Sequence, residues 1–179
     1  MILLVGASAS GKTEVAKLLN ALYGIKKVIT HTTRPMRKTE ENDIDYHFVS
    51  KDEFLKLKEQ GAFVETTLYN GNFYGSSKKE IADDKVLIVD PNGFKSFLEL
   101  HDPRIVTFFL DANEKTRFER MILRGDSVEQ AKSRIANDET KFPEELKHKT
   151  NYQIDSENMT LLDMTNKIHN LYINHLKNL

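Results

Sequence analysis

The feature that most constrains the fold lies near the start of the chain, where an apolar run meets a loop of small residues. Residues 2–5 are Ile-Leu-Leu-Val, which predicts a short buried strand. The next residues, Gly6 to Thr13, fit the spacing Gly-x-x-x-x-Gly-Lys-Thr, and residues 13–23 then place apolar side chains at helical spacing. A strand that turns through glycines into a helix leaves backbone N–H groups open to an anion. The segment therefore predicts a phosphate-binding loop, and the alternative is a glycine-rich turn that binds nothing.

Each residue type in such a loop has a physical role. Small side chains let successive N–H groups converge on phosphate oxygens, while Lys12 reaches the β- and γ-phosphates and the Thr13 hydroxyl helps to hold Mg²⁺. We therefore expect a nucleoside triphosphate with Mg²⁺ as the cofactor and Thr13 as the metal-binding residue. The expected ATP-binding residues are Gly6, Ala7, Ser8, Ala9, Ser10, Gly11, Lys12, Thr13 and Glu14.

The remaining sequence narrows the class of nucleotide-binding protein. A GTPase would normally carry an N-K-x-D segment, but Asn166-Lys167 is followed by Ile168 and His169. With 179 residues the chain is also short for a motor or transporter ATPase. A kinase for a small acceptor fits this length, and it predicts a second anion-binding site.

Charge and composition exclude other classes of partner. The net charge is −1, from 26 basic and 27 acidic residues, so no global field favours nucleic acid or an anionic membrane. There are no cysteines, which excludes disulfides and cysteine-bound zinc and is compatible with a reducing cytosol. No apolar run approaches the roughly 20 residues that cross a bilayer. We expect a cytoplasmic protein, monomeric or homodimeric, with small-molecule nucleotides as partners.

Hydrophobic periodicity predicts an α/β protein. Buried strands separated by helices indicate a parallel sheet that is covered on both faces. Strands are expected at 2–5, 26–30, 45–50, 63–69, 73–77, 85–90, 105–111 and 151–155, and helices at 13–23, 51–60, 92–100, 113–124, 128–140 and 159–177. We expect one domain over 1–179: a three-layer core (1–33 and 84–179), a small inserted α+β lobe (about 34–83) and a helical lid (about 120–140).

The second anion site is predicted in the polar stretch after residue 30. Arg34 and Arg37 lie three residues apart in a loop, and Tyr46 follows. Arginine forks bind phosphate through paired hydrogen bonds, and tyrosine hydroxyls add donors. Taken alone, this stretch is better explained as a solvated basic turn.

Longer patterns give this stretch a family resemblance. "TTRPMRKTEENDIDYHFVS", from Thr32 to Ser50, resembles the guanylate kinase family pattern T-T-R-x-x-R-x-x-E-x-x-x-x-D-Y-x-F-V-S at every fixed position. "GAFVETTLYNGNFYGSS" is similar to the family's G-x-F-[IL]-E…G-x-x-Y-G-[ST] segment, and "ERMILRGDSVEQAKSRI" to its lid, R-x-x-x-R-G…R. The resemblance thus covers nearly the whole chain from the phosphate-binding loop to the lid.

The resemblance implies a role for each matched residue. Arg34, Arg37, Tyr46 and Tyr74 would hold the phosphate of GMP, and Glu65 would bind the guanine edge with help from Ser76 and Thr30. Asp90 would lie beside the guanine, and Glu40 would order the lobe or contact GMP. Arg120, Arg124 and Arg134 would close over the transferring phosphoryl group, with Lys12 and Arg34 completing the catalytic set.

The chain departs from the family pattern at four places. At one of them, Thr30-His31 stands where a serine usually precedes T-T-R, which keeps one hydroxyl. Ala7 and Ala9 replace the usual proline and glycine of the loop, where the backbone does the binding. Ile88 replaces the first acid of L-D-x-D, so only Asp90 remains. Asp155 or Ser156 falls where an asparagine usually lies near the adenine, so the preference for the donor base stays open.

The resemblance implies ATP-dependent phosphorylation of GMP, and of dGMP, to the diphosphate. Two alternatives are a kinase for another phosphorylated acceptor and a non-catalytic guanylate-kinase-like interaction domain. The residues expected at Glu65, Ser76 and Asp90 argue against the first, and an intact Lys12-Thr13 pair argues against the second.

Overall fold

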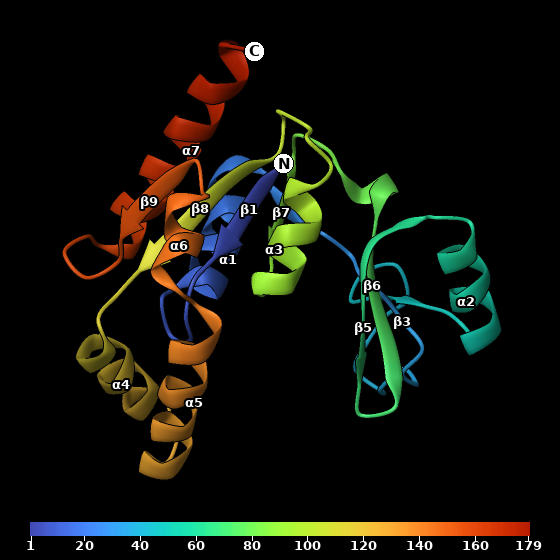
Figure 1. The fold of residues 1–179 in the computed structure, drawn as a ribbon, viewed down its shortest axis with the longest axis horizontal. Coiled ribbons are helices and arrows are strands. Elements are labelled where there is room, and N and C mark those ends of the chain that lie inside the picture. Colours follow the sequence, from blue (N-terminus) through green and yellow to red (C-terminus); the bar gives the residue numbers. More distant parts are fainter.

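The computed structural model describes residues 1–179, which form two β-sheets (Figure 1). The main sheet has five parallel strands in the order β2 (Lys26–Lys27), β7 (Lys85–Ile88), β1 (Ile2–Val5), β8 (Val106–Asp111) and β9 (Tyr152–Asp155). The smaller sheet has four strands in the order β4 (His47–Phe48), β3 (His31–Thr32), β6 (Asn72–Ser77) and β5 (Phe63–Tyr69). The two sheets lie side by side in Figure 1, with the smaller one on the right.

The central strand β1 explains why helices cover both faces of the main sheet. Its side chains alternate between two buried clusters, and all four of its residues are fully buried. Ile2 and Leu4 pack with residues of α1 (Lys12–Tyr23) and α7 (Leu161–Lys177). Leu3 and Val5 pack with residues of α3 (Pro91–Leu98) and α6 (Glu144–His148). The predicted three-layer α/β core is therefore confirmed.

The smaller sheet and α2 (Lys51–Glu59) form a lobe with its own apolar centre. Phe54 of α2 stacks on Phe63 of β5 and Phe73 of β6, with ring centroids 4.6 and 5.3 Å apart. The β5–β6 turn is Asn70-Gly71, with φ values of 47° and 76°, as a two-residue hairpin with a type I′ turn requires. The predicted hairpin is thus present, and its turn residues set its register.

The region predicted to be the lid consists of two helices, which lie below the main sheet in Figure 1. They are α4 (Glu114–Leu123) and α5 (Val128–Lys141), joined by a short turn. Met121, Ala131 and Ile135 pack between them, and Ala9 of the first loop contacts this cluster. The lid helices therefore rest directly on the Gly6–Thr13 loop.

Some elements differ from the sequence prediction. The strand expected at 26–30 ends at Lys27, and the loop expected from residue 31 begins with β3, which pairs with β6 and β4. The smaller sheet therefore includes His31, ahead of the lobe boundary expected near 34. The strand expected at 45–50 is reduced to β4, while α6 and the 3₁₀ turn Lys78–Glu80 were not expected. No helix combines the length and apolar character that crossing a bilayer needs.

Candidate functional site

The Gly6–Thr13 loop connects the carboxyl end of β1 to α1. A Cβ atom at Gly6 would lie 2.5 Å from the Leu110 carbonyl oxygen and 2.9 Å from Ser10 Oγ, so only glycine fits there. Ser10 is fully buried, while Thr13 is exposed on the first turn of the helix. The predicted loop residues are thus brought together around one turn of backbone.

Lys12 folds back into this loop. Its Nζ donates to the carbonyl oxygens of Gly6 and Ala7, both at 2.7 Å, and to Ser10 Oγ at 3.2 Å. Burial lowers the pKa of Lys12 to about 8, and the carboxylate of Asp138 opposes that shift. The loop therefore holds an ammonium group that is only weakly stabilised in its charged form.

A cavity of about 300 Å³ opens beside the loop, between α1, α4 and the start of α7. Arg120 spans its wall, since one guanidinium nitrogen lies 3.2 Å from the Ala9 carbonyl oxygen and 2.8 Å from Ser156 Oγ. Ser156 is fully buried and donates to the Ser10 carbonyl oxygen at 2.7 Å. The lining residues are Ala9, Gly11, Glu14, Arg120, Arg124, Ser156, Met159, Leu161 and Met164.

Sequence reasoning missed part of this cavity wall. Met159, Leu161 and Met164 belong to an apolar stretch that indicated only a core helix. Of the two residues expected near the donor base, Ser156 lines the cavity, whereas the carboxylate of Asp155 accepts from Asn158 at 2.7 Å. The cavity is therefore lined both by apolar side chains and by two arginines.

The other lid arginines are paired with one carboxylate at the α4–α5 turn. Arg124 donates to Asp126 at 2.7 Å, and Nε of Arg134 lies 3.9 Å from the same carboxylate. The hydrogen bonds from Arg124 hold the pKa of Asp126 below its ordinary value. The lid thus carries two partly exposed guanidinium groups bridged by a single negative charge.

In the lobe, the guanidinium group of Arg34 forms two hydrogen bonds with the carboxylate of Glu40. Its two terminal nitrogens lie 3.0 and 2.7 Å from the two Glu40 oxygens. The backbone N–H of Arg37 also donates to Glu40, at 2.8 Å. The guanidinium lies 5.4 Å from the Tyr46 ring centroid. The hydrogen bonds from Arg34 and Arg37 lower the pKa of Glu40. Arg34 is therefore held in place by an acidic side chain of its own loop.

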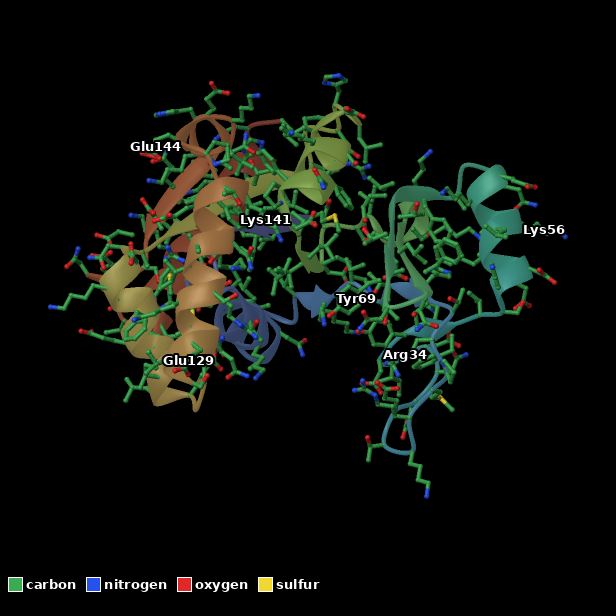
Figure 2. The ribbon with its side chains drawn as sticks, turned by 60° about the horizontal axis from the view of Figure 1, so that its bottom comes forward. Arg34, Lys56, Tyr69, Glu129, Lys141 and Glu144 are labelled. Atoms are coloured by element: carbon green, nitrogen blue, oxygen red, sulfur yellow. The ribbon has the colours of Figure 1, made fainter.

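Two tyrosines and an exposed arginine surround this pair. The Tyr46 and Tyr74 rings pack edge to face, with centroids 6.2 Å apart. Arg37 has an exposed side chain on the same loop. Figure 2 shows Arg34 in the lobe and Glu129 and Lys141 near the two ends of α5, on a separate body of the molecule. The structure thus gathers Arg34, Tyr46 and Tyr74 at one place, apart from the lid.

Glu65 and Ser76 form the polar centre of the hairpin. They face each other across β5 and β6, where a bulge between Phe63 and Glu65 shifts the register. The Ser76 hydroxyl donates to Glu65 Oε1 at 2.6 Å. The carboxylate is therefore anchored through one oxygen on a rigid strand.

Two further predicted residues lie where the lobe meets the core. The Thr30 carbonyl oxygen accepts the His47 N–H at 2.9 Å, and Thr30 lies in the segment that connects β2 to β3. Asp90 caps α3 by accepting the Gly93 N–H at 2.8 Å. Because α3 packs against β5, Asp90 and Glu65 lie on neighbouring elements.

Comparisons with known proteins agree on one family. A sequence model described as guanylate kinase matches residues 1–174. The guanylate kinase of Chromohalobacter salexigens is 33% identical over 151 residues, which is 79% of this chain and 70% of that protein. That of Neisseria meningitidis is 33% identical over 144 residues, covering 76% of this chain and 70% of that protein.

Solved structures agree with the sequence comparisons. The crystal structure of guanylate kinase from Anaplasma phagocytophilum superposes with a TM-score of 0.58 at 26% identity, covering 96% of this chain and 83% of that one. A gluconokinase from Sinorhizobium meliloti, 14% identical with a TM-score of 0.54, shares the fold alone. Because the family model spans almost all of the sequence, the chain belongs to the guanylate kinase family.

Proposed function

We propose that this enzyme is an ATP:GMP phosphotransferase, which converts ATP and GMP, or dGMP, into ADP and the guanine nucleoside diphosphate. The observation that carries the proposal is the Glu65–Ser76 pair, an anchored carboxylate on the lobe of a chain that belongs to this family. A carboxylate accepts both the N1–H and the N2 amino group of guanine. The intact Lys12-Thr13 pair argues against a domain that only binds partners.

The donor nucleotide is proposed to bind at the Gly6–Thr13 loop, with its base in the cavity beside it. The loop amides and Lys12 would hold the phosphates, and Met159, Leu161 and Met164 would pack against the base. Lys12 is already directed into the loop, where its partners are weak carbonyl acceptors that phosphate oxygens can replace.

The residues present fit a magnesium ion held largely by the nucleotide. Thr13 offers an exposed hydroxyl at the start of α1, and no group of three or more acidic or histidine side chains forms a protein cage. Mg²⁺ prefers oxygen ligands and commonly keeps water and phosphate in its shell. When bound, it would neutralise charge on the donor phosphates, with Thr13 as its protein ligand.

The acceptor phosphate is proposed to bind Arg34, Arg37, Tyr46 and Tyr74 in the lobe. Glu40 holds the Arg34 fork in a fixed plane, which orders the site before the anion arrives. Thr30 and Asp90 lie at the border between the lobe and the core, from which they would contact the nucleoside. The attacking oxygen belongs to a phosphate that is already anionic, so the reaction needs no general base.

Phosphoryl transfer requires positive charge between two polyanions. Arg120 lies at the donor cavity, and Arg124 and Arg134 sit on the same lid. We propose that these three arginines approach the transferring group together with Lys12, and that Asp126 releases its arginines to the phosphates as the lid closes. Water is excluded at the same step, which limits hydrolysis of ATP.

The function is tested by measuring ADP release with a panel of acceptors. The purified enzyme with ATP and Mg²⁺ is expected to phosphorylate GMP and dGMP and to show much lower kcat/KM for AMP, CMP and UMP. Preference for an acceptor other than guanine nucleotides would overturn the acceptor assignment, and no turnover of any acceptor would favour a binding domain.

The pKa of Lys12 predicts proton uptake when ATP binds. Phosphate favours the ammonium form and raises this pKa above its free value of about 8. At about pH 9 the free enzyme is mainly neutral at Lys12, so ATP binding takes up a proton and weakens as pH rises through about 8. At about pH 7 the group is already charged, and this uptake is absent.

Calorimetry in two buffers of different ionisation enthalpy measures this uptake. Lys12→Met is the control, because it keeps the protonation of ATP itself and removes that of the lysine. Equal proton uptake in the wild type and Lys12→Met at the higher pH would contradict the prediction.

The substrates and the composition also suggest where the protein works and how many chains it needs. Soluble nucleotides as substrates and a chain without cysteines suit the cytoplasm. We propose that both substrate sites lie within one chain, so a monomer suffices for activity and a homodimer is compatible with it.

A further inference from the structure

A buried ion pair lies directly beneath the Gly6–Thr13 loop. Arg117 of α4 donates to Asp138 of α5 at 2.9 Å, and both residues are 7% exposed. Asp138 also accepts the backbone N–H of Ser8 at 2.9 Å and lies 3.3 Å from its hydroxyl. Nε of Arg117 donates to the Ala112 carbonyl oxygen at 3.2 Å. One carboxylate therefore joins two lid helices to the loop.

The pair belongs to the same helices as the lid arginines. Arg117 lies three residues before Arg120 on α4, and Asp138 lies four residues after Arg134 on α5, about one helical turn in each case. Any tilt of either helix relative to the loop changes the geometry at Ser8. The pair thus links the position of the lid to the position of the loop.

Stability alone does not explain two buried charges at this place. Removing charges from water is costly, and apolar residues of similar volume often replace a buried ion pair without loss of stability. Apolar side chains cannot, however, hold the Ser8 N–H. The ion pair instead provides a carboxylate oxygen that accepts the Ser8 N–H and so holds the loop at that residue.

We propose that Asp138 and Arg117 are positioning residues for phosphoryl transfer, which fix the Gly6–Thr13 loop against the helices that carry Arg120 and Arg134. The inference rests on the proposed function of that loop. Ser8 follows Gly6 and Ala7, whose carbonyl oxygens bind Lys12, and it precedes Ala9, whose carbonyl oxygen binds Arg120. Loss of the hydrogen bond from Ser8 to Asp138 would therefore disturb the positions of both Lys12 and Arg120.

The first test is Asp138→Asn, which keeps the size of the side chain and one acceptor oxygen but removes the charge. It leaves Arg117 as an unpaired buried cation and weakens the hydrogen bond from the Ser8 N–H, because a neutral amide oxygen replaces a carboxylate. We expect kcat to fall by roughly 10- to 100-fold, in line with the cost of a small misplacement of reacting groups. KM for ATP should rise several-fold, while KM for GMP stays within about twofold, because the lobe does not touch the pair.

The second test separates positioning from folding. The double variant Arg117→Met/Asp138→Leu removes both charges and refills the space, so its melting temperature is expected to match or exceed that of Asp138→Asn. It still lacks the acceptor for Ser8, so kcat and the affinity for a non-hydrolysable ATP analogue should stay low. Ile168→Val, on α7 in the main core cluster, is the control for a destabilised protein with normal kinetics.

The outcomes are distinct. If the double variant has wild-type kcat and analogue affinity, the pair is structural only and the proposal is wrong. Wild-type kinetics in folded Asp138→Asn would also overturn it, and if Asp138→Asn does not fold, the double variant decides alone. If the wild type binds the ATP analogue but transfers no phosphoryl group to GMP, the proposed function is refuted instead. The affinity for the analogue then still tests whether Arg117 and Asp138 position the loop.

Discussion

Glu65→Gln is expected to lower kcat/KM for GMP by roughly 10³-fold or more, with little change in the affinity for ATP. Guanine presents the N1–H and the N2 amino group along one edge, and a carboxylate accepts both. The Ser76 hydroxyl donates to Glu65 Oε1 at 2.6 Å, which holds that oxygen in place and leaves the other free to accept. Glutamine keeps the shape but turns a donor toward one of the guanine donors. The cost is large because the mismatch leaves buried polar groups unpaired.

The measurement is kcat/KM for GMP, IMP and AMP on the wild type and the variant. IMP lacks the N2 amino group and is expected to fall between GMP and AMP for the wild type, and the GMP-to-AMP ratio should narrow in the variant. Glu59→Gln, at the exposed end of α2, makes the same change of charge on the lobe and should leave all three values unchanged. A variant that keeps the wild-type ratio would show that Glu65 does not select the base.

Lys12→Ala is expected to lower kcat by about 10²- to 10³-fold, as the loss of one directed electrostatic group does in other enzymes. The lysine is half-buried in the loop, and its neighbours at the start of α1 offer no second cation, since Glu14 and the apolar Val15 follow the exposed Thr13. The affinity for GMP should change little, since the residues proposed to bind GMP lie in the lobe.

Steady-state kinetics and GMP titration of the purified variant measure both effects. Lys17→Ala removes an exposed lysine from the same helix and is the matched control. Near wild-type turnover in Lys12→Ala would refute the role of the loop in phosphoryl transfer.

The sequence was sufficient to predict the elements whose signals are local. The β5–β6 hairpin follows from the turn signal Asn70-Gly71, and α2 from the apolar residues Phe54, Leu55 and Leu57 ahead of Gly61. The first loop was recognisable because its spacing is a consequence of backbone geometry. The family resemblance supplied the expected roles of the lobe residues, which spacing alone left open.

The remaining features depend on contacts between distant segments. β3 is only two residues long and exists because β6 and β4 pair with it, so its own residues carry no strand signal. Arg117 and Asp138 occupy helical positions where charged side chains are normally solvated. Only the packing of α4 and α5 on the loop shows that they are buried together. The apolar wall of the donor cavity was hidden for the same reason, because core methionines and cavity methionines look alike in sequence.

The strand order also determines which part of the molecule is able to fold first during synthesis. β1 leaves the ribosome before both of its partners, β7 and β8, which begin only at Lys85 and Val106. The hairpin of the lobe pairs neighbouring segments that are complete by Ser77. Pairing between distant segments carries the larger entropic cost and is slow, whereas a hairpin forms locally. The hairpin segment is therefore able to pair while the apolar residues of β1 are still without partners, and unpaired apolar strand residues of this kind favour aggregation.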